Sequence, residues 1–283
     1  MSFLQSNLTR FDSQAGRVPA GNGALVPFSR MKFVPVLRQG WILGSRDYKL
    51  IGIGSILGPL WPTITLAIRV ILIGYVFAIV LNTRQDDYLP WLATGWASWL
   101  MISSSINNGA MAFDNSKRLM LSIPIILESF VVRVVTKQLL IFLQNLVVVL
   151  VVMLVYKVPV TFALLLVVPG LLISGVFLTG LGMILGPLVS KRKDFGQLIS
   201  SLMSAMFFVL PIVWQPDSIK TEGANLIIGL NPLYHYLQII RLPLMSEVPT
   251  VLNYSLAVLG AIVAVGVGAL VMAKVRDKLV YWV

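Results

Sequence analysis

Long apolar stretches separated by polar connections make up most of this chain beyond residue 32. A helix that crosses a bilayer needs about 20 apolar residues in succession. Six stretches approach that length, and the second is the most polar because it contains the run MISSSINNGAMAF. The pattern therefore predicts an all-α integral membrane protein with six transmembrane helices, at about residues 59–82, 91–112, 134–156, 159–187, 197–214 and 251–273.

The N-terminal region before these stretches has two parts. Residues 1–32 are polar and rich in Ser, Gly and Asn, without the apolar core of a secretory signal peptide, so we expect a flexible cytoplasmic tail. Residues 33–52 mix apolar and charged side chains, which favours a cytoplasmic amphipathic helix in the membrane interface. The alternative is a helix that merely precedes the first span. Residues 33–283 would then form the membrane domain, with residues 274–283 as its cytoplasmic C-terminus.

Two connections contain apolar pieces interrupted by proline, which is not expected of simple loops. Pro124 interrupts the segment AFDNSKRLMLSIPIILESFVVRVVTKQ, which predicts a short cytoplasmic helix before the third span. The connection before the last span contains two short apolar pieces, ANLIIGL and YHYLQIIRLPLM, separated by Asn231 and Pro232. Each piece is too short to cross a bilayer. Together they predict a re-entrant helical hairpin that enters from the outer side, with a folded external loop as the alternative.

Basic residues are distributed unevenly between the two sides of the predicted bundle. Six spans place both termini on one side, and that side holds seventeen Lys and Arg residues against four on the other. Such a bias is typical of the cytoplasmic side, so we expect a multi-pass protein with both termini in the cytoplasm. The net charge of +11 is then explained by orientation and by contact with anionic lipid, and no nucleic-acid partner is needed.

The amino-acid composition excludes several classes of catalytic site. The chain is 57% hydrophobic and only 12% charged, with no cysteine and one histidine, so thiolate and multi-histidine metal sites are excluded. No glycine-rich loop followed by Lys-Ser or Lys-Thr is present to hold nucleotide phosphates. We expect a conduit or carrier that is not an enzyme, has no metal or cofactor of its own, and takes its energy from elsewhere.

Three segments carry a resemblance to a known family. SILGPLWP at residues 55–62 opens the first span, SKRKDFGQLI at residues 190–199 joins the fourth and fifth spans, and NPLYHYLQIIR at residues 231–241 precedes the last. With six spans and cytoplasmic termini, they resemble the membrane subunit of type-2 ABC exporters, the ABC-2 permeases. The branch to which the chain is most similar exports O-antigen, capsular or teichoic polysaccharides.

This resemblance implies a homodimer in the bacterial inner membrane, paired with two copies of a separate ABC nucleotide-binding ATPase. That partner would bind ATP and Mg, and the substrate would be a polysaccharide carried on a polyprenyl-pyrophosphate lipid, as in lipopolysaccharide or capsule biosynthesis. An ABC-2 permease for teichoic acid is one alternative. An ion-coupled secondary carrier acting alone and a membrane enzyme for lipid-linked sugars are two others, although neither inverted repeats nor paired interfacial acids are evident.

An exporter without a nucleotide site must contact its ATPase through cytoplasmic elements. The helix of residues 33–52 and the segment of residues 114–128 are the two that the sequence offers. We expect the ATPase-coupling residues to be Trp41 in the first element and Lys117, Arg118, Leu119, Met120 and Leu121 in the second.

Arg69 is the most unusual residue of the first span. A charge near the middle of a span costs about 2.5–3.5 kcal/mol, and no acidic residue lies within this span to pair with it. Three roles remain open: it lines the export path and contacts sugar or phosphate oxygens, it bonds to Ser104 or Asn107 of the second span, or it extends to the membrane surface.

The second span supplies the other candidates for the substrate path. Trp96 and Trp99 are three residues apart and share a helical face, where their rings would pack against sugar C–H groups. The alternative is interface anchoring, because Trp and Tyr are generally enriched there. The polar run that contains Ser104 and Asn107 favours the path, since such groups need partners at bilayer depth.

Two further sets of residues each have a functional interpretation and a purely structural one. Arg38, Arg46 and Lys49 are placed to contact the lipid pyrophosphate at the cytoplasmic interface, or they are ordinary orienting charges. Gly182 and Gly186 of the fourth span form a small-xxx-small pair that allows close helix packing, with a hinge as the alternative.

Overall fold

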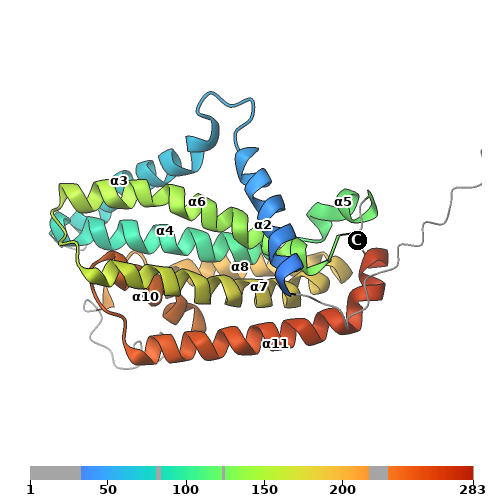
Figure 1. Ribbon diagram of the computed structural model, residues 1–283. Helices are drawn as coiled ribbons and strands as arrows, with labels where there is room; N and C mark the ends of the chain where they lie inside the picture. Colours follow the sequence, from blue (N-terminus) through green and yellow to red (C-terminus); the bar gives the residue numbers. More distant parts are fainter. Residues whose placement is uncertain (1–32, 81–83, 123–124, 217–228, 283) are drawn as a thin grey trace, which may run out of the picture. The chain divides into compact units, whose positions relative to one another are not determined.

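The computed structural model describes residues 33–80, 84–122, 125–216 and 229–282, and within these ranges it contains helices and no strand (Figure 1). The predicted tail of residues 1–32 lies outside the described residues. The elements are α2 (Phe33–Lys49), η2 (Gly58–Leu60), α3 (Trp61–Val80), α4 (Gln85–Ala110), η3 (Asp114–Ser116), α5 (Lys117–Ser122), α6 (Glu128–Val155), η4 (Phe162–Leu166), α7 (Val167–Lys191), α8 (Asp194–Val209), α10 (Pro232–Leu244) and α11 (Val251–Trp282).

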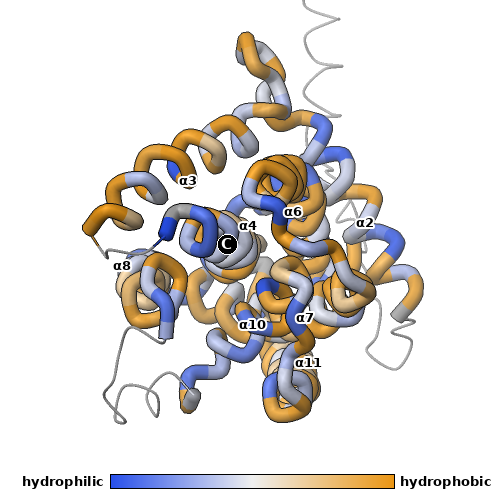
Figure 2. Tube along the Cα trace, turned by 90° about the vertical axis from the view of Figure 1, so that its left-hand side faces the viewer, coloured by the Kyte–Doolittle hydropathy of each residue, from blue (hydrophilic) through white to orange (hydrophobic). Residues whose placement is uncertain are grey.

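In the described part of the chain, the helices α3, α4, α6, α7, α8 and α11 run alongside one another, with α4 at their centre (Figure 1). Helix α4 packs against α3, α6, α7, α8 and α10, and most of its side chains from Tyr88 to Ala110 are buried. Viewed along the bundle, α3 and α8 lie on one side of α4 (Figure 2). Ser98, Ser103 and Ser105 of α4 are therefore covered by protein, whereas Asn108 is exposed.

Four helices in the described part of the chain are long and apolar enough to cross a membrane. They comprise Gly58–Val80, Glu128–Val155, Phe162–Lys191 and Val251–Leu279. The predicted first, third, fourth and sixth spans correspond to them. The second and fifth do not meet this criterion, because α4 is rich in polar residues and α8 has only 16 residues.

The connection before the last span is helical where the structure describes it. Helix α10 begins at Pro232, and the side chain of Asn231 caps it by accepting a hydrogen bond from the backbone N–H of Leu233. Its side chains are almost all buried, against α4, α7 and α11. Most of the first half of the predicted re-entrant hairpin, residues 224–230, lies outside the described residues.

Glycines allow α7 to approach its neighbours closely. A Cβ atom at Gly180 would lie 2.5 Å from backbone atoms of Ala264 and Val265 on α11. Gly182 faces Val131 of α6, and Gly186 faces Phe113, whose ring would lie 2.6 Å from an added Cβ. These close contacts support the interpretation that Gly182 and Gly186 allow tight helix packing.

Replacing Gly180 by Ala is expected to lower the free energy of unfolding by about 1–3 kcal/mol, because the new methyl group meets backbone that cannot rotate away. Gly175 is the matched control on the same helix, since an added Cβ there meets nothing nearer than 3.9 Å. Gly175→Ala should be neutral or slightly stabilising. Thermal unfolding of both variants in detergent measures the difference, and equal stability would contradict the close crossing of α7 and α11.

Candidate functional site

A groove between α3, α4 and α8 gathers most of the predicted path residues. Arg69 of α3 and Trp96, Trp99 and Asn107 of α4 all line it. Both tryptophans are otherwise buried, and the ring of Trp96 packs at 5.2 Å, centroid to centroid, against Phe207 of α8. The groove is completed by Leu100, Ser103, Met203, Ser204 and Phe208.

A second pocket lies between α3, α4 and α6, on the other side of Arg69. It has a volume of about 300 Å³, at the lower end of the range of ligand pockets. Ser104, the fifth predicted path residue, lines this pocket, and Arg69 and Leu100 line both cavities. The structure therefore brings all five residues to two adjoining cavities that share Arg69. Their role in transport stays a prediction.

The side chain of Arg69 is exposed and makes no hydrogen bond or ion pair with any residue that the structure describes. It is not bonded to Ser104 or Asn107, the partners that one interpretation of the sequence expected. The side-chain oxygen of Asn107 is itself buried without a hydrogen-bond partner. Arg69 is thus held beside two cavities with its guanidinium unpaired.

Two residues of the second pocket were not predicted from the sequence. Gln138 and Asn145 of α6 line it and are 8% and 2% exposed. They lie seven residues apart, two helical turns, and so share one face of α6. Two amides at that spacing within a predicted span are the signal that could have found them, because polar groups at bilayer depth need partners or a wet cavity.

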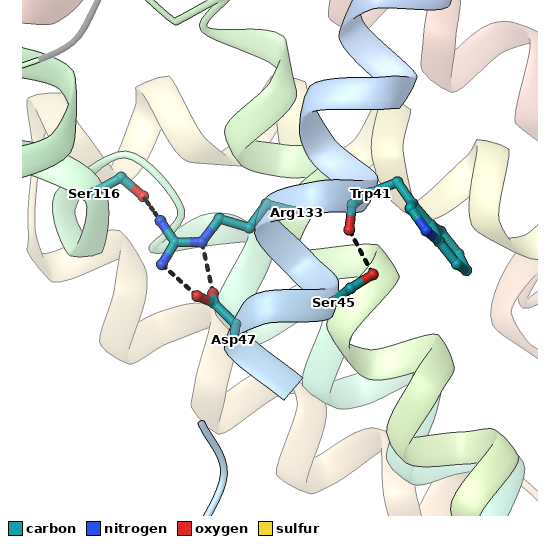
Figure 3. A network of polar contacts seen from close by, with 5 residues as sticks. All are labelled: Trp41, Ser45, Asp47, Ser116 and Arg133. Carbon is teal, nitrogen blue, oxygen red and sulfur yellow. Dashed lines mark hydrogen bonds and ion pairs between the residues drawn. The ribbon is translucent and has the colours of Figure 1, made fainter. Parts of the chain in front are cut away.

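A network of polar contacts fixes α2 to the beginning of α6 (Figure 3). Arg133 donates from Nε to Asp47 at 2.6 Å and from a terminal nitrogen to the other carboxylate oxygen at 2.9 Å. Its remaining nitrogen donates to Ser116 in η3 at 3.2 Å. The Oε1 atom of Gln39 accepts bonds from the backbone N–H of Ile126 and the hydroxyl of Ser129. Helix α2 is therefore linked to both α6 and the segment that leads into α5.

The other face of α2 is exposed and carries four of the predicted residues. Trp41 points away from the Arg133 network (Figure 3), and Arg38, Arg46 and Lys49 are also exposed. The three basic side chains line neither the groove nor the pocket described above. Their predicted contact with lipid pyrophosphate, and that of Trp41 with an ATPase, stay predictions.

Helix α5 divides the remaining coupling candidates into two groups. Lys117, Arg118 and Leu121 are exposed, and Leu121 shows 65% of its surface. Leu119 and Met120 are partly buried and pack against the cluster of Phe113 and its neighbours. Only the first group is available to a partner without disturbing the fold.

Reversing one charge of the Asp47–Arg133 pair, in Asp47→Arg or Arg133→Asp, is expected to cost about 1–2 kcal/mol, because the pair is bidentate but its side chains are about one-fifth exposed. The double swap should restore part of this loss. Thermal unfolding in detergent provides the measurement. Asp86→Arg is the control, because its pair with Arg84 is long, at 3.6 Å, and well exposed. Additive losses in the double variant would contradict a direct pair.

Two more cations are buried, although the sequence placed Arg241 in the connection before the last span and Arg276 in the cytoplasmic C-terminus. Arg276 of α11 donates to the carboxylate of Glu128 at 3.0 Å and ties the end of α11 to the beginning of α6. Arg241 of α10 is fully buried, with its guanidinium carbon 3.8 Å from the centre of the Trp91 ring. That cation–π contact stabilises a charge whose nitrogens have no hydrogen-bond partner in the described residues.

Comparison with known proteins identifies a family match and related proteins for this chain. The family model for the ABC-2 type transporter matches residues 38–245. The chain is 25% identical over 192 residues to the O-antigen export system permease protein RfbA of Myxococcus xanthus, covering 68% of this chain and 74% of that protein. It is 24% identical over 193 residues to a protein of the same name from Klebsiella pneumoniae, with the same shares covered.

Proposed function

Because this chain belongs to the ABC-2 type transporter family, we propose that it is the membrane-spanning subunit of an ATP-driven exporter of lipid-linked polysaccharide. The polymer would be of the O-antigen or capsule class, and the two relatives are named for O-antigen export. It would cross the bacterial inner membrane from the cytoplasm.

The observation that carries the substrate class is the groove along α3, α4 and α8. Its lining combines the largely buried indole rings of Trp96 and Trp99 with the hydroxyl of Ser103, the amide of Asn107 and the charge of Arg69. Aromatic rings pack against the C–H faces of sugars, and hydroxyl, amide and guanidinium groups bond sugar oxygens. Such a surface tolerates many sugar sequences, which suits the passage of a long polymer.

The proposed topology has six crossings. Helix α4 has 26 residues, about 39 Å at 1.5 Å per residue, and most of its residues are buried against other helices. Helix α8, with the segment that follows it, would cross at the side of the groove. Both termini and α5 would be cytoplasmic, α2 would lie in the interface, and α10 would enter from the outer side, in line with the distribution of basic residues.

The proposed assembly supplies what this chain lacks. Two copies of an ABC ATPase would bind ATP and Mg and contact α2 and α5 of two copies of this chain. In such a homodimer, the second copy would close the open side of the groove. The membrane-spanning chain then needs no nucleotide site, and its work is to change conformation when the ATPase does.

The experiment is a deletion of this chain in its host, with complementation by the wild-type chain and an affinity tag on the complementing copy. The expected result is loss of surface polysaccharide, accumulation of lipid-linked polymer on the cytoplasmic leaflet of the membrane, and co-purification of an ABC ATPase. Intact surface polysaccharide in the deletion strain would refute the proposal. Loss of a phosphate-containing wall polymer instead would favour the teichoic acid alternative, and transport that persists with an inactive ATPase would favour a secondary carrier.

A further inference from the structure

The pocket between α3, α4 and α6 contains two amides, whereas the groove beside it contains one amide and four aromatic residues. The lining of the pocket contains one cation, two amides and two hydroxyls, and no Asp or Glu. The guanidinium of Arg69 points to no partner among the described residues. The lining includes Trp61, Thr65, Arg69, Ser104, Gln138 and Asn145.

Buried amides in this pocket have donors to spare. Gln138 is 8% exposed, and no described residue bonds to its side chain. Asn145 is 2% exposed, and its Oδ1 atom accepts a bond from the hydroxyl of Thr63, which leaves its N–H groups as donors. A buried amide without a partner is costly, so these groups favour a ligand that accepts hydrogen bonds.

The donors and the charge together select an anion. Arg69 provides a guanidinium, whose fork of N–H groups matches phosphate oxygens. Gln138, Asn145 and Ser104 add neutral donors, and no carboxylate in the lining repels negative charge. A sugar hydroxyl would use these donors as well, but only an anion also satisfies the unpaired cation.

The position of the pocket points to a lipid-borne anion. Trp61 and Arg69 lie 3 and 11 residues after Gly58, where the candidate span begins, which is about 5 and 16 Å along the helix. Along α3 the pocket thus runs from the beginning of the candidate span toward its middle. Along α6, Gln138 and Asn145 lie 10 and 17 residues after Glu128, about 15 and 26 Å, so the pocket lies within the spans of both helices. Helices α3 and α6 are both candidate spans, so an acyl or prenyl chain beside them stays in hydrocarbon while its headgroup enters between them.

We propose that this pocket binds the phosphate end of the lipid carrier while the first sugars lie in the adjoining aromatic groove, with Arg69 at the boundary between the two. This inference rests on the proposed function and assigns Gln138 and Asn145 a role in holding the carrier phosphate. It places the phosphate site inside the bundle rather than on the exposed face of α2.

The test is a binding measurement with the full-length chain in phosphatidylcholine nanodiscs. Undecaprenyl diphosphate is the probe, and undecaprenol, which lacks phosphate, is the reference lipid. Gln138→Glu and Asn145→Asp are expected to weaken diphosphate binding at least about tenfold, the equivalent of one charge-assisted hydrogen bond, and to leave undecaprenol binding unchanged. Diphosphate binding that is unchanged in both variants would overturn the proposal.

A second variant keeps the test decisive if the added acids unfold the protein. Gln138→Leu removes the donors without adding charge, and Gln238→Leu is its control because Gln238 is also buried, at 3% exposed, but lies on α10 away from this pocket. Only Gln138→Leu should weaken diphosphate binding. Equal effects of the two variants would point to general destabilisation and contradict the assignment.

One outcome distinguishes the lipid carrier from a membrane phospholipid as the source of the phosphate. Another distinguishes failure of this inference from failure of the proposed function. Phosphatidylglycerol that displaces the diphosphate at equal concentration would overturn the assignment to the lipid carrier and make this a phospholipid site. The nanodisc measurement needs neither ATPase nor export. Gln138-dependent diphosphate binding with intact surface polysaccharide in the deletion strain would therefore refute the proposed function alone, whereas export that persists in Gln138→Glu would refute this inference alone.

Discussion

Export is expected to fall more than tenfold, with ATP hydrolysis retained, when Arg118 is replaced by Glu and Leu121 by Asp. Both side chains are exposed on α5, at the end of the bundle where α2 and the end of α11 also lie (Figure 1). A partner that packs on Leu121 and pairs with Arg118 would lose an apolar contact and meet a reversed charge. Movement of the ATPase would then no longer be passed to the bundle.

The design of this variant follows from the packing of α5. Leu119 and Met120 contact the cluster around Phe113, so acidic residues there would disturb the fold itself. Lys278→Asp, an exposed reversal on α11, is the matched control. Surface polysaccharide and ATPase activity of the purified complex are the two readouts. Normal surface polymer in the double variant would exclude α5 as the coupling element.

The second large effect on export is expected from removal of the charge at Arg69. Arg69→Leu should lower export about tenfold or more while the protein still inserts, because a guanidinium that contacts sugar or phosphate oxygens contributes about 1.5–3 kcal/mol. The side chain is exposed to two cavities and has no described partner, so its loss leaves no buried group unpaired. Insertion would improve slightly, since an intramembrane charge is removed.

Two other variants show whether the site or the charge alone matters. Arg84→Leu removes an exposed arginine at the beginning of α4 that lines neither cavity, and it should leave export unchanged. Arg69→Lys keeps the charge but loses the fork of N–H donors, so an intermediate effect is expected. Export is measured as polymer on intact cells relative to the amount of inserted protein. Full export in Arg69→Leu would contradict a role on the path.

The sequence was sufficient for the helices whose apolar length exceeds the bilayer thickness. Gly58–Val80 and Val251–Leu279 are recognisable because lipid must cover most of their surface. The resemblance to ABC-2 permeases is confirmed by the family match and the two relatives. Four spans of the predicted six meet the apolar-length criterion. The other two differ because neighbouring helices cover the polar groups of α4 and because α8 is short.

Helix boundaries set by tertiary contacts could not be read from hydrophobicity. The third span was predicted to begin at residue 134, whereas α6 begins at Glu128. Arg133 looked like a loop charge, but its ion pair with Asp47, 86 residues away, allows it to lie within the helix. Glu128 is likewise paired with Arg276 across 148 residues. A local pattern carries no information about such distant partners.

Some residues of the candidate site could be predicted from the sequence, and others could be found only from the packing. Arg69, Trp96, Trp99, Ser104 and Asn107 were selected as unusual residues within apolar spans, and the structure gathers them at adjoining cavities. Gln138 and Asn145 were missed because α6 also contains Gln144, and the sequence alone does not show which of these amides line a cavity. Their significance depends on α6 facing α3 and α4, which only the packing shows.

The central claim is that this chain exports polysaccharide only when a partner hydrolyses ATP. Proteoliposomes that contain the purified chain and its ATPase, loaded with lipid-linked polysaccharide on the accessible leaflet, test it most directly. Transfer of the polymer across the bilayer should require ATP and should stop when the ATPase is inactive or absent. Transfer by the chain alone, without any hydrolysing partner, would contradict the claim.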